Sequence, residues 1–156
     1  TGADQPCTTW TPLLSDGKYY LPSNDFSGLV STPMFAEFFL PLVEQECRFL
    51  THSMYHLDGP GALRHLDLLL AIPELDAVQF VPPPSDTCFS SWVWVYQRIQ
   101  KAGKGVQVTC RLDEIDSIMQ TLQPQGLYLV VHDVPSRQAA ESTLAALEKW
   151  CTQIGN

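Results

Sequence analysis

A histidine and a carboxylate within residues 53-60, SMYHLDGP, are the strongest candidates for chemistry in this sequence. Residues 53-55 are typical of a short buried strand, and His56 and Asp58 follow two positions apart. Side chains alternate between the faces of a strand, so these two point the same way. We therefore predict a site at this strand end, with His56 and Asp58 as its candidate catalytic residues.

A structural role is the alternative interpretation of the same residues. His56 would then hydrogen-bond the loop that follows it. Asp58 would cap the helix that begins after Gly59 and Pro60.

Other polar side chains also stand at the ends of predicted strands. Asp25 follows the first strand, Cys110 ends the fourth, and His132 ends the fifth, which is the most apolar. Gln79 is expected on the sheet face near His56. We predict these four as ligand-binding residues, with a hydrogen bond to a backbone amide as the alternative for Asp25 and a buried structural thiol as the alternative for Cys110.

The elements that must position these residues alternate along the chain. Strands are predicted at 18-21, 53-56, 76-81, 106-110 and 126-131, and helices at 33-49, 61-70, 91-102, 113-122 and after Ser136. The first of these helices begins with Thr32 as its N-cap and Pro33 at its first position. Alternation of this kind predicts a parallel sheet covered by helices.

The number of βα units limits which parallel α/β folds the chain can form. A closed βα barrel takes eight units and about 250 residues, and no phosphate-binding glycine motif follows a strand. The sequence therefore predicts an α/β fold, a partial (half) TIM barrel of about five βα units with its strands in sequential order. Residues 1-16 are expected to be an extended N-terminal segment, and 17-156 a single domain.

Composition excludes some classes of function. The net charge of −8 argues against a nucleic-acid groove, which requires clustered Lys and Arg. No apolar run approaches the roughly 20 residues of a membrane helix. The five cysteines are odd in number and form no CxxC pair. We expect a soluble protein with free thiols, in the cytoplasm or an organelle with a reducing interior.

Two segments resemble a known family. NDFSGLVSTPMFAEFFLP (24-41) and YHLDGPGALRHLDLLLAIPELDAVQFVP (55-82) are similar to the uroporphyrinogen decarboxylase superfamily, especially its branch near the corrinoid and thiol methyltransferases. Family members are complete TIM barrels of roughly twice this length, and this chain resembles their C-terminal half. The resemblance implies a lyase that decarboxylates a porphyrinoid, or a methyltransferase that acts on a thiol.

The resemblance also implies a metal site. In the methyltransferase branch a His-x-Cys pair at the corresponding strand end and a residue of the last strand bind zinc. The matching residues here are His56, Asp58 in place of the cysteine, and His132, so the implied cofactor is zinc. Histidine and carboxylate side chains are both zinc ligands.

Two hypotheses follow for the function. The first is a truncated member of this superfamily, with a strand-end site that binds a metal or a small carboxylated ligand. The second is a non-catalytic half-barrel module that forms a homodimer or docks on a complementary half-barrel chain, because a half-barrel alone exposes sheet edges.

Overall fold

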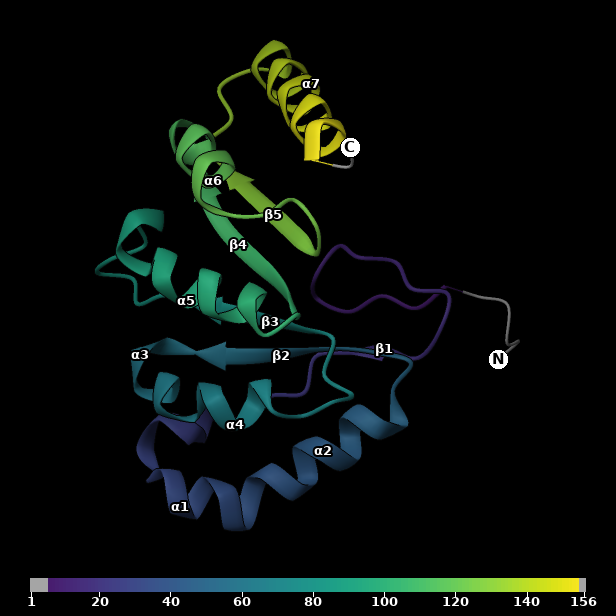
Figure 1. Cartoon of the computed structure of the whole chain (residues 1–156), viewed down its shortest axis with the longest axis vertical. Coiled ribbons are helices and arrows are strands. Elements are labelled where there is room, and N and C mark those ends of the chain that lie inside the picture. The colour runs from purple at the N-terminus through teal and green to yellow at the C-terminus, as the bar shows by residue number, and fades with distance from the viewer. Residues whose placement is uncertain (1–5, 155–156) are drawn as a thin grey trace. The chain divides into compact units, whose positions relative to one another are not determined.

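The computed structural model describes residues 6–154. The chain divides into two compact units, the first ending at Val81 and the second beginning at Pro82. In Figure 1, unit 1 carries the labels β1 to β3 and unit 2 the labels α5 to α7. This division does not test the predicted 17-156 domain, and residues 1-5 of the predicted N-terminal segment lie outside the described residues.

Unit 1 contains three parallel strands. Its elements are β1 (Tyr19–Tyr20), η1 (Asp25–Leu29), α1 (Thr32–Met34), η2 (Phe35–Phe39), α2 (Leu40–Phe49), β2 (His52–Asp58), α3 (Gly59–Ala62), η3 (Leu63–His65), α4 (Leu66–Leu70) and β3 (Ala77–Val81). Strand β2 pairs with β1 on one side and with β3 on the other. The helices between the strands provide the crossovers that parallel pairing requires.

Unit 2 contains two further parallel strands. Its elements are α5 (Phe89–Lys101), β4 (Gly105–Arg111), η4 (Leu112–Glu114), α6 (Ile115–Thr121), β5 (Leu127–His132) and α7 (Arg137–Ile154). Strand β4 pairs with β5 along its length, and Arg111 lies opposite His132 at the carboxyl ends.

The five strands follow the order β1-β2-β3-β4-β5. Helices separate consecutive strands, and the strand pairs within each unit are parallel. The predicted α/β class, with the sequential strand order of a half-barrel, is therefore confirmed.

The first long helical segment runs through α1, η2 and α2 without a break. Its N-cap is Ser31, whose Oγ accepts a hydrogen bond from the Met34 amide, so the predicted Thr32 cap was wrong by one residue. The Leu40 amide donates to the Phe35 carbonyl, five residues back, in a π-helical turn. This wider turn comes directly before Pro41, which lacks an amide hydrogen to donate.

Each unit has its own apolar core. In unit 1 the fully buried side chains include Phe35, Tyr55, Leu57, Leu66 and Phe80. In unit 2 they include Phe89, Val95, Tyr96, Ile99 and Val108. The rings of Phe89 and Tyr96 stack with their centroids 5.6 Å apart, which packs the first turns of α5 together. The cores hold β2, β3 and β4 rigidly, so side chains at their carboxyl ends have fixed positions.

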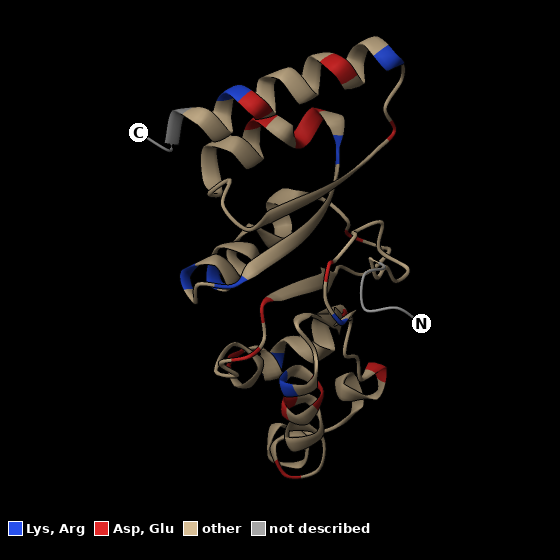
Figure 2. Ribbon diagram, turned by 90° about the vertical axis from the view of Figure 1, so that its right-hand side faces the viewer, with Lys and Arg blue, Asp and Glu red and all other residues tan. Residues whose placement is uncertain are grey.

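Charged residues are spread over many elements. Figure 2 shows Lys and Arg as separate short segments of the ribbon, not as one stripe. Within residues 6–154, no helix combines the length and the apolar character needed to cross a membrane.

Candidate functional site

The carboxyl end of β2 positions His56 against β3. Parallel register places His56 directly opposite Gln79, and His56 Nδ1 lies 2.6 Å from Gln79 Oε1. Gln79 is buried, whereas the His56 side chain keeps 21% of its surface exposed. An amide oxygen only accepts, so Nδ1 carries the hydrogen and donates it. In the neutral ring the lone pair is then on Nε2.

The segment after β1 brings Asp25 to the other ring nitrogen. The His56 amide donates to the Pro22 carbonyl at 2.9 Å, and Ser23 forms an isolated parallel bridge with His56. The chain then turns into η1, where Asp25 Oδ1 lies 3.9 Å from His56 Nε2. Asp25, His56 and Gln79, three of the predicted site residues, thus lie together in unit 1.

Buried neighbours hold η1 in place. His65 is fully buried, stacks on Phe35 with ring centroids 4.3 Å apart, and donates from Nε2 to the Ser27 carbonyl at 2.9 Å. A Cβ on Gly61 would lie only 3.2 Å from the Gly28 carbonyl oxygen. The position of Asp25 beside His56 therefore depends on this close contact between α3 and η1.

Trp10 is a neighbour of His56 that the sequence did not predict. Its ring meets the imidazole edge to face, with centroids 6.1 Å apart, and meets Tyr20 at 5.7 Å. Trp10 lies in a segment whose apolar residues follow neither a helical nor a strand period, so the sequence did not predict its contact with His56. The indole covers one side of His56 but leaves part of the imidazole open to a small molecule.

Asp58 lies two residues beyond His56 at the end of β2 and is exposed. It occupies the N-cap position of α3, yet its side chain accepts no capping hydrogen bond. The alternative role of Asp58 as a helix cap is therefore absent from this structure. Gly59 follows with φ 75°, a conformation that favours glycine and turns the chain sharply away from the strand.

Unit 2 has its own polar strand ends. His132 is exposed opposite Arg111. Arg111 donates twice to the Asp113 carboxylate, at 2.9 and 2.7 Å, and these hydrogen bonds hold the pKa of Asp113 below its usual range. A hollow of about 430 Å³ opens here, lined by Arg111, Leu112, Asp113, Asp133 and Pro135.

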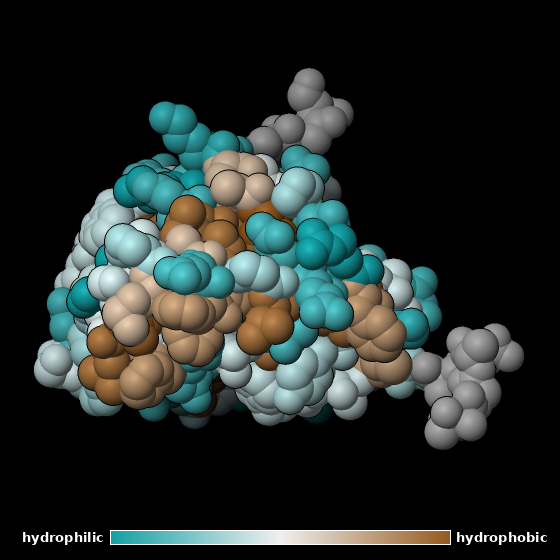
Figure 3. Space-filling model, turned by 90° about the horizontal axis from the view of Figure 1, so that it is seen from below, coloured by the Kyte–Doolittle hydropathy of each residue, from teal (hydrophilic) through white to brown (hydrophobic). Residues whose placement is uncertain are grey.

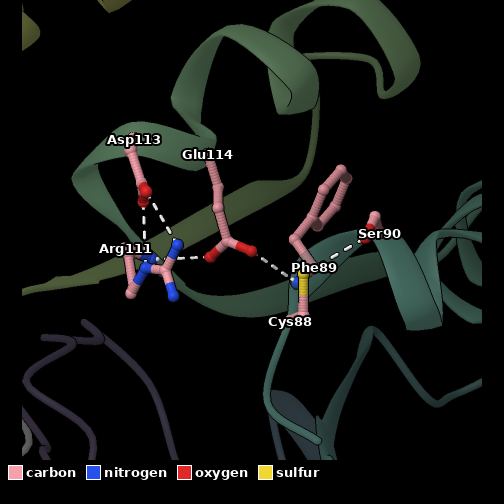
Figure 4. A network of polar contacts seen from close by, with 6 residues as sticks. All are labelled: Cys88, Phe89, Ser90, Arg111, Asp113 and Glu114. Carbon is pink, nitrogen blue, oxygen red and sulfur yellow. Dashed lines mark hydrogen bonds and ion pairs between the residues drawn. The ribbon is translucent and has the colours of Figure 1, made fainter.

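A buried carboxylate ties the end of β4 to the start of α5. Glu114 Oε2 accepts from the Arg111 amide at 2.9 Å, and Oε1 accepts from the Phe89 amide at 2.7 Å (Figure 4). The Phe89 amide belongs to the first turn of α5, where helix amides lack partners within the helix. Glu114 thus satisfies one buried and one partly buried amide that are far apart in sequence. The sequence analysis did not identify this residue.

Cys110 is buried near the end of β4. Burial, followed by the charges of Cys110 and Glu114, raises the pKa of Tyr96 in α5. Burial, together with the charge of Glu114, raises the pKa of Cys110 to about 12. The Cys110 thiol is therefore protonated and enclosed at neutral pH, which agrees with the alternative interpretation of a buried structural thiol. The ligand-binding role of Cys110 stays a prediction.

The predicted zinc ligands come from both units. His56 and Asp58 belong to unit 1, and His132 belongs to unit 2. Within residues 6–154, no three His, Cys, Asp or Glu side chains form a group that could hold a metal ion. Of the predicted set, β2 places only His56 and Asp58 on one strand end.

Comparisons with known proteins give no assignment. No family model matches the chain, and searches of curated proteins and of solved structures find no match.

Replacing Glu114 with Ala should lower the free energy of unfolding by about 3 kcal/mol, because the buried Phe89 amide and the partly buried Arg111 amide lose a charged acceptor. Glu114→Gln should lose less, since one amide oxygen can still accept. Urea unfolding followed by circular dichroism measures both. Asp113→Ala is the matched control, because it removes only an exposed pair with Arg111. Equal losses in Glu114→Ala and Asp113→Ala would contradict the bridging role.

Alkylation of the native chain with iodoacetamide at about pH 8 should modify the exposed Cys7, Cys88 and Cys151 and spare Cys47 and Cys110. Mass spectrometry of tryptic peptides reads out each site. The folded protein favours the neutral Cys110 thiol, whereas the thiol of the unfolded chain ionises from about pH 9.0 upward. The contribution of Cys110 to the free energy of unfolding is therefore fully present below pH 9.0 and is lost as the pH rises toward about 12. Modification of Cys110 as fast as Cys88 would instead support an accessible, ligand-binding thiol.

Proposed function

We propose that unit 1 binds a small molecule at the carboxyl end of β2, with His56 as the group that exchanges a proton with it. The observation that carries this proposal is the 2.6 Å contact between His56 Nδ1 and Gln79 Oε1. A buried partner that fixes the tautomer leaves Nε2 as the nitrogen available to a ligand. Partial exposure of the imidazole allows the ligand to approach.

The surrounding charge selects the kind of ligand. Asp25 lies beside Nε2, and Asp58 stands two residues along the same strand. A polycarboxylate would be repelled by these two carboxylates, whereas a group that donates a proton to Nε2 would be accepted. The Asp25 carboxylate, 3.9 Å from Nε2, would then face the nitrogen that has taken up the proton.

The resemblance to the uroporphyrinogen decarboxylase superfamily implies two reactions. Methyl transfer to a thiol suits this strand end better than decarboxylation of a porphyrinoid, because the thiol proton has an acceptor in Nε2. The sulfur would form a bond to the methyl carbon as the bond from that carbon to the methyl donor breaks, and the donor, which the resemblance implies is a methylated corrinoid, would keep the electron pair of the broken bond. His56 would take that proton and Asp25 would hold the charged ring. Asp58 would serve as a second base or as a ligand to a metal.

Zinc is the cofactor that the resemblance implies, and it would activate a thiol by favouring its deprotonated form. A zinc ion bound through Nε2 would take the place of the proton there, because that nitrogen has only one lone pair, so His56 would be a zinc ligand instead of the proton acceptor. Asp58 would be the second ligand from β2. Among the described residues, 6–154, no third His, Cys, Asp or Glu side chain joins these two in a group that could hold a metal ion.

A small neutral thiol such as 2-mercaptoethanol should raise the melting temperature of the full chain by about 5 °C when present at roughly 100 times its dissociation constant. His56→Ala should abolish the increase, because the proton acceptor is lost. Thermal unfolding monitored by intrinsic fluorescence measures the shift. Uroporphyrin, tested in parallel, represents the decarboxylase alternative.

His52→Ala is the matched control, since His52 is an exposed histidine at the opposite end of the same strand. It should keep the full response. Loss of the response in both variants, or no response of the unmodified chain to either ligand, would overturn the proposed site. Elemental analysis of the same proteins tests the zinc ligands, because a metal bound through His56 should be lost only in His56→Ala.

One observation favours the second function, a half-barrel module within a larger assembly. Strand β5 ends the strand order, and its residues from Leu127 to Val131 are apolar but only half-buried. In a closed βα barrel every strand has a neighbour on both sides. A complementary chain that supplies the next strand would cover this edge.

Amide hydrogen exchange tests this second function. In the isolated chain, β5 should exchange faster than β2, because one side of β5 lacks a neighbouring strand in the described sheet. In the assembly purified from its native source, β5 should become as protected as β2. Unchanged exchange in β5 would remove the case for a complementary chain.

A further inference from the structure

The outward side of the first helical segment carries a row of exposed apolar side chains. Met34, Phe38, Leu42 and Phe49 are 47%, 55%, 57% and 68% exposed. We call these four residues the outer helix face. They are exposed, whereas Phe35, Val43 and Cys47 on the adjacent side of the helix are buried, so the core of unit 1 uses the buried side and leaves these four residues in solvent. In Figure 1 this segment, α1 to α2, runs along the lower edge of the molecule.

The π-helical turn keeps the row straight. A turn of five hydrogen-bonded residues between Phe35 and Leu40 places residues four apart on one side. Met34, Phe38 and Leu42 follow this spacing, and Phe49 lies two α-helical turns beyond Leu42. Figure 3 shows apolar groups gathered on the face seen from below, where this segment lies.

We propose that the outer helix face pairs with the same face of a second copy of this chain, antiparallel and with Leu42 at the centre of the twofold axis. Such an isologous contact is self-complementary, because each residue meets its counterpart across the axis. Leu42 meets Leu42 of the second copy, and Met34 lies opposite Phe49 of the second copy. This contact goes beyond the proposed ligand site and does not depend on it.

Shape supports this alignment. A hollow of about 390 Å³ lies at the Phe49 end, lined by Tyr20, Glu46, Phe49 and Leu50. In the antiparallel arrangement this hollow receives Met34 of the second copy. Methionine is flexible enough to fill an irregular recess of this kind.

Charge favours antiparallel over parallel pairing, although Arg48 also lies 3.6 Å from Glu44 of its own helix, in an exposed ion pair that contributes little by itself. Glu37 lies near the Met34 end of the face, whereas Arg48 lies at the Phe49 end, where Lys18 Nζ sits 4.0 Å from the Phe49 ring centroid. Glu37 and Arg48 flank the same side of the row. Antiparallel pairing therefore puts Glu37 next to Arg48 of the second copy, twice per dimer. Parallel pairing would put like charges together.

The outer helix face supplies about half of the area that a standard dimer interface buries on each partner. Two half-exposed aromatic rings with Leu42 and Met34 offer on the order of 400 Å² of apolar surface. The flanking residues and the hollow add to it. A standard interface buries about 800 Å² on each partner, and its apolar centre carries most of the affinity.

The first test removes the apolar contact. Sedimentation velocity of the full chain should show a dimer, and Phe38→Glu with Leu42→Glu should raise its dissociation constant by about 100-fold or more. Trp94→Glu is the matched control, because Trp94 is exposed to a similar degree in unit 2. Circular dichroism confirms that each variant is folded. A monomeric unmodified chain, or a dimer that the Phe38 and Leu42 changes leave intact, would overturn the proposal.

The second test reads the orientation. Glu37→Arg alone and Arg48→Glu alone should each weaken the dimer by about three- to tenfold, because like charges then face each other. The two changes together should restore the original affinity. A double variant as weak as the singles would rule out the antiparallel pairing. Thiol binding at His56 should be unchanged in all of these variants, which separates this proposal from the proposed function.

Discussion

The parallel register between β2 and β3 is the constraint on which the candidate site depends. It sets His56 opposite Gln79, and the hydrogen bond between them decides which ring nitrogen remains available. A shift of one residue in this register would turn every side chain of β2 to the other face. The apolar residues Tyr55 and Leu57, fully buried on the opposite face, prevent such a shift. Burial of the Tyr55 and Leu57 face of β2 thus determines which side chains its other face presents, including His56.

The two polar strand ends are built on different principles. In unit 1 the carboxylate of Asp25 approaches an ionisable ring across 3.9 Å and stays largely exposed, an arrangement that can respond to a ligand. In unit 2 the carboxylate of Glu114 is buried and accepts from two backbone amides, which joins β4 to α5. The exposed Asp25 carboxylate can still accept hydrogen bonds from a ligand, whereas both oxygens of the Glu114 carboxylate already accept hydrogen bonds within the protein. This contrast is the physical reason for placing the proposed site in unit 1.

Much of this arrangement could be predicted from the sequence, because it follows from local periodicity. Alternating strands and helices predicted the α/β class, and the period of two along β2 predicted that His56 would share a face with Asp58. Contacts that depend on packing could not be predicted. Trp10 reaches His56 from a segment without a pattern, and Glu114 bonds an amide 25 residues away in sequence. The N-cap at Ser31 was missed because Thr32, next to Pro33, has the same local chemistry.

The central claim is that Gln79 fixes the neutral His56 ring with its hydrogen on Nδ1 and its lone pair on Nε2. Nitrogen-15 NMR of the histidine-labelled chain, at a pH where the ring is neutral, measures this directly, because the two tautomers exchange the shifts of the ring nitrogens. The account predicts a protonated Nδ1 in the unmodified chain. Without the acceptor, in Gln79→Leu, the account predicts a mixture of both tautomers. A ring protonated on Nε2, or the same spectrum in both proteins, would contradict it.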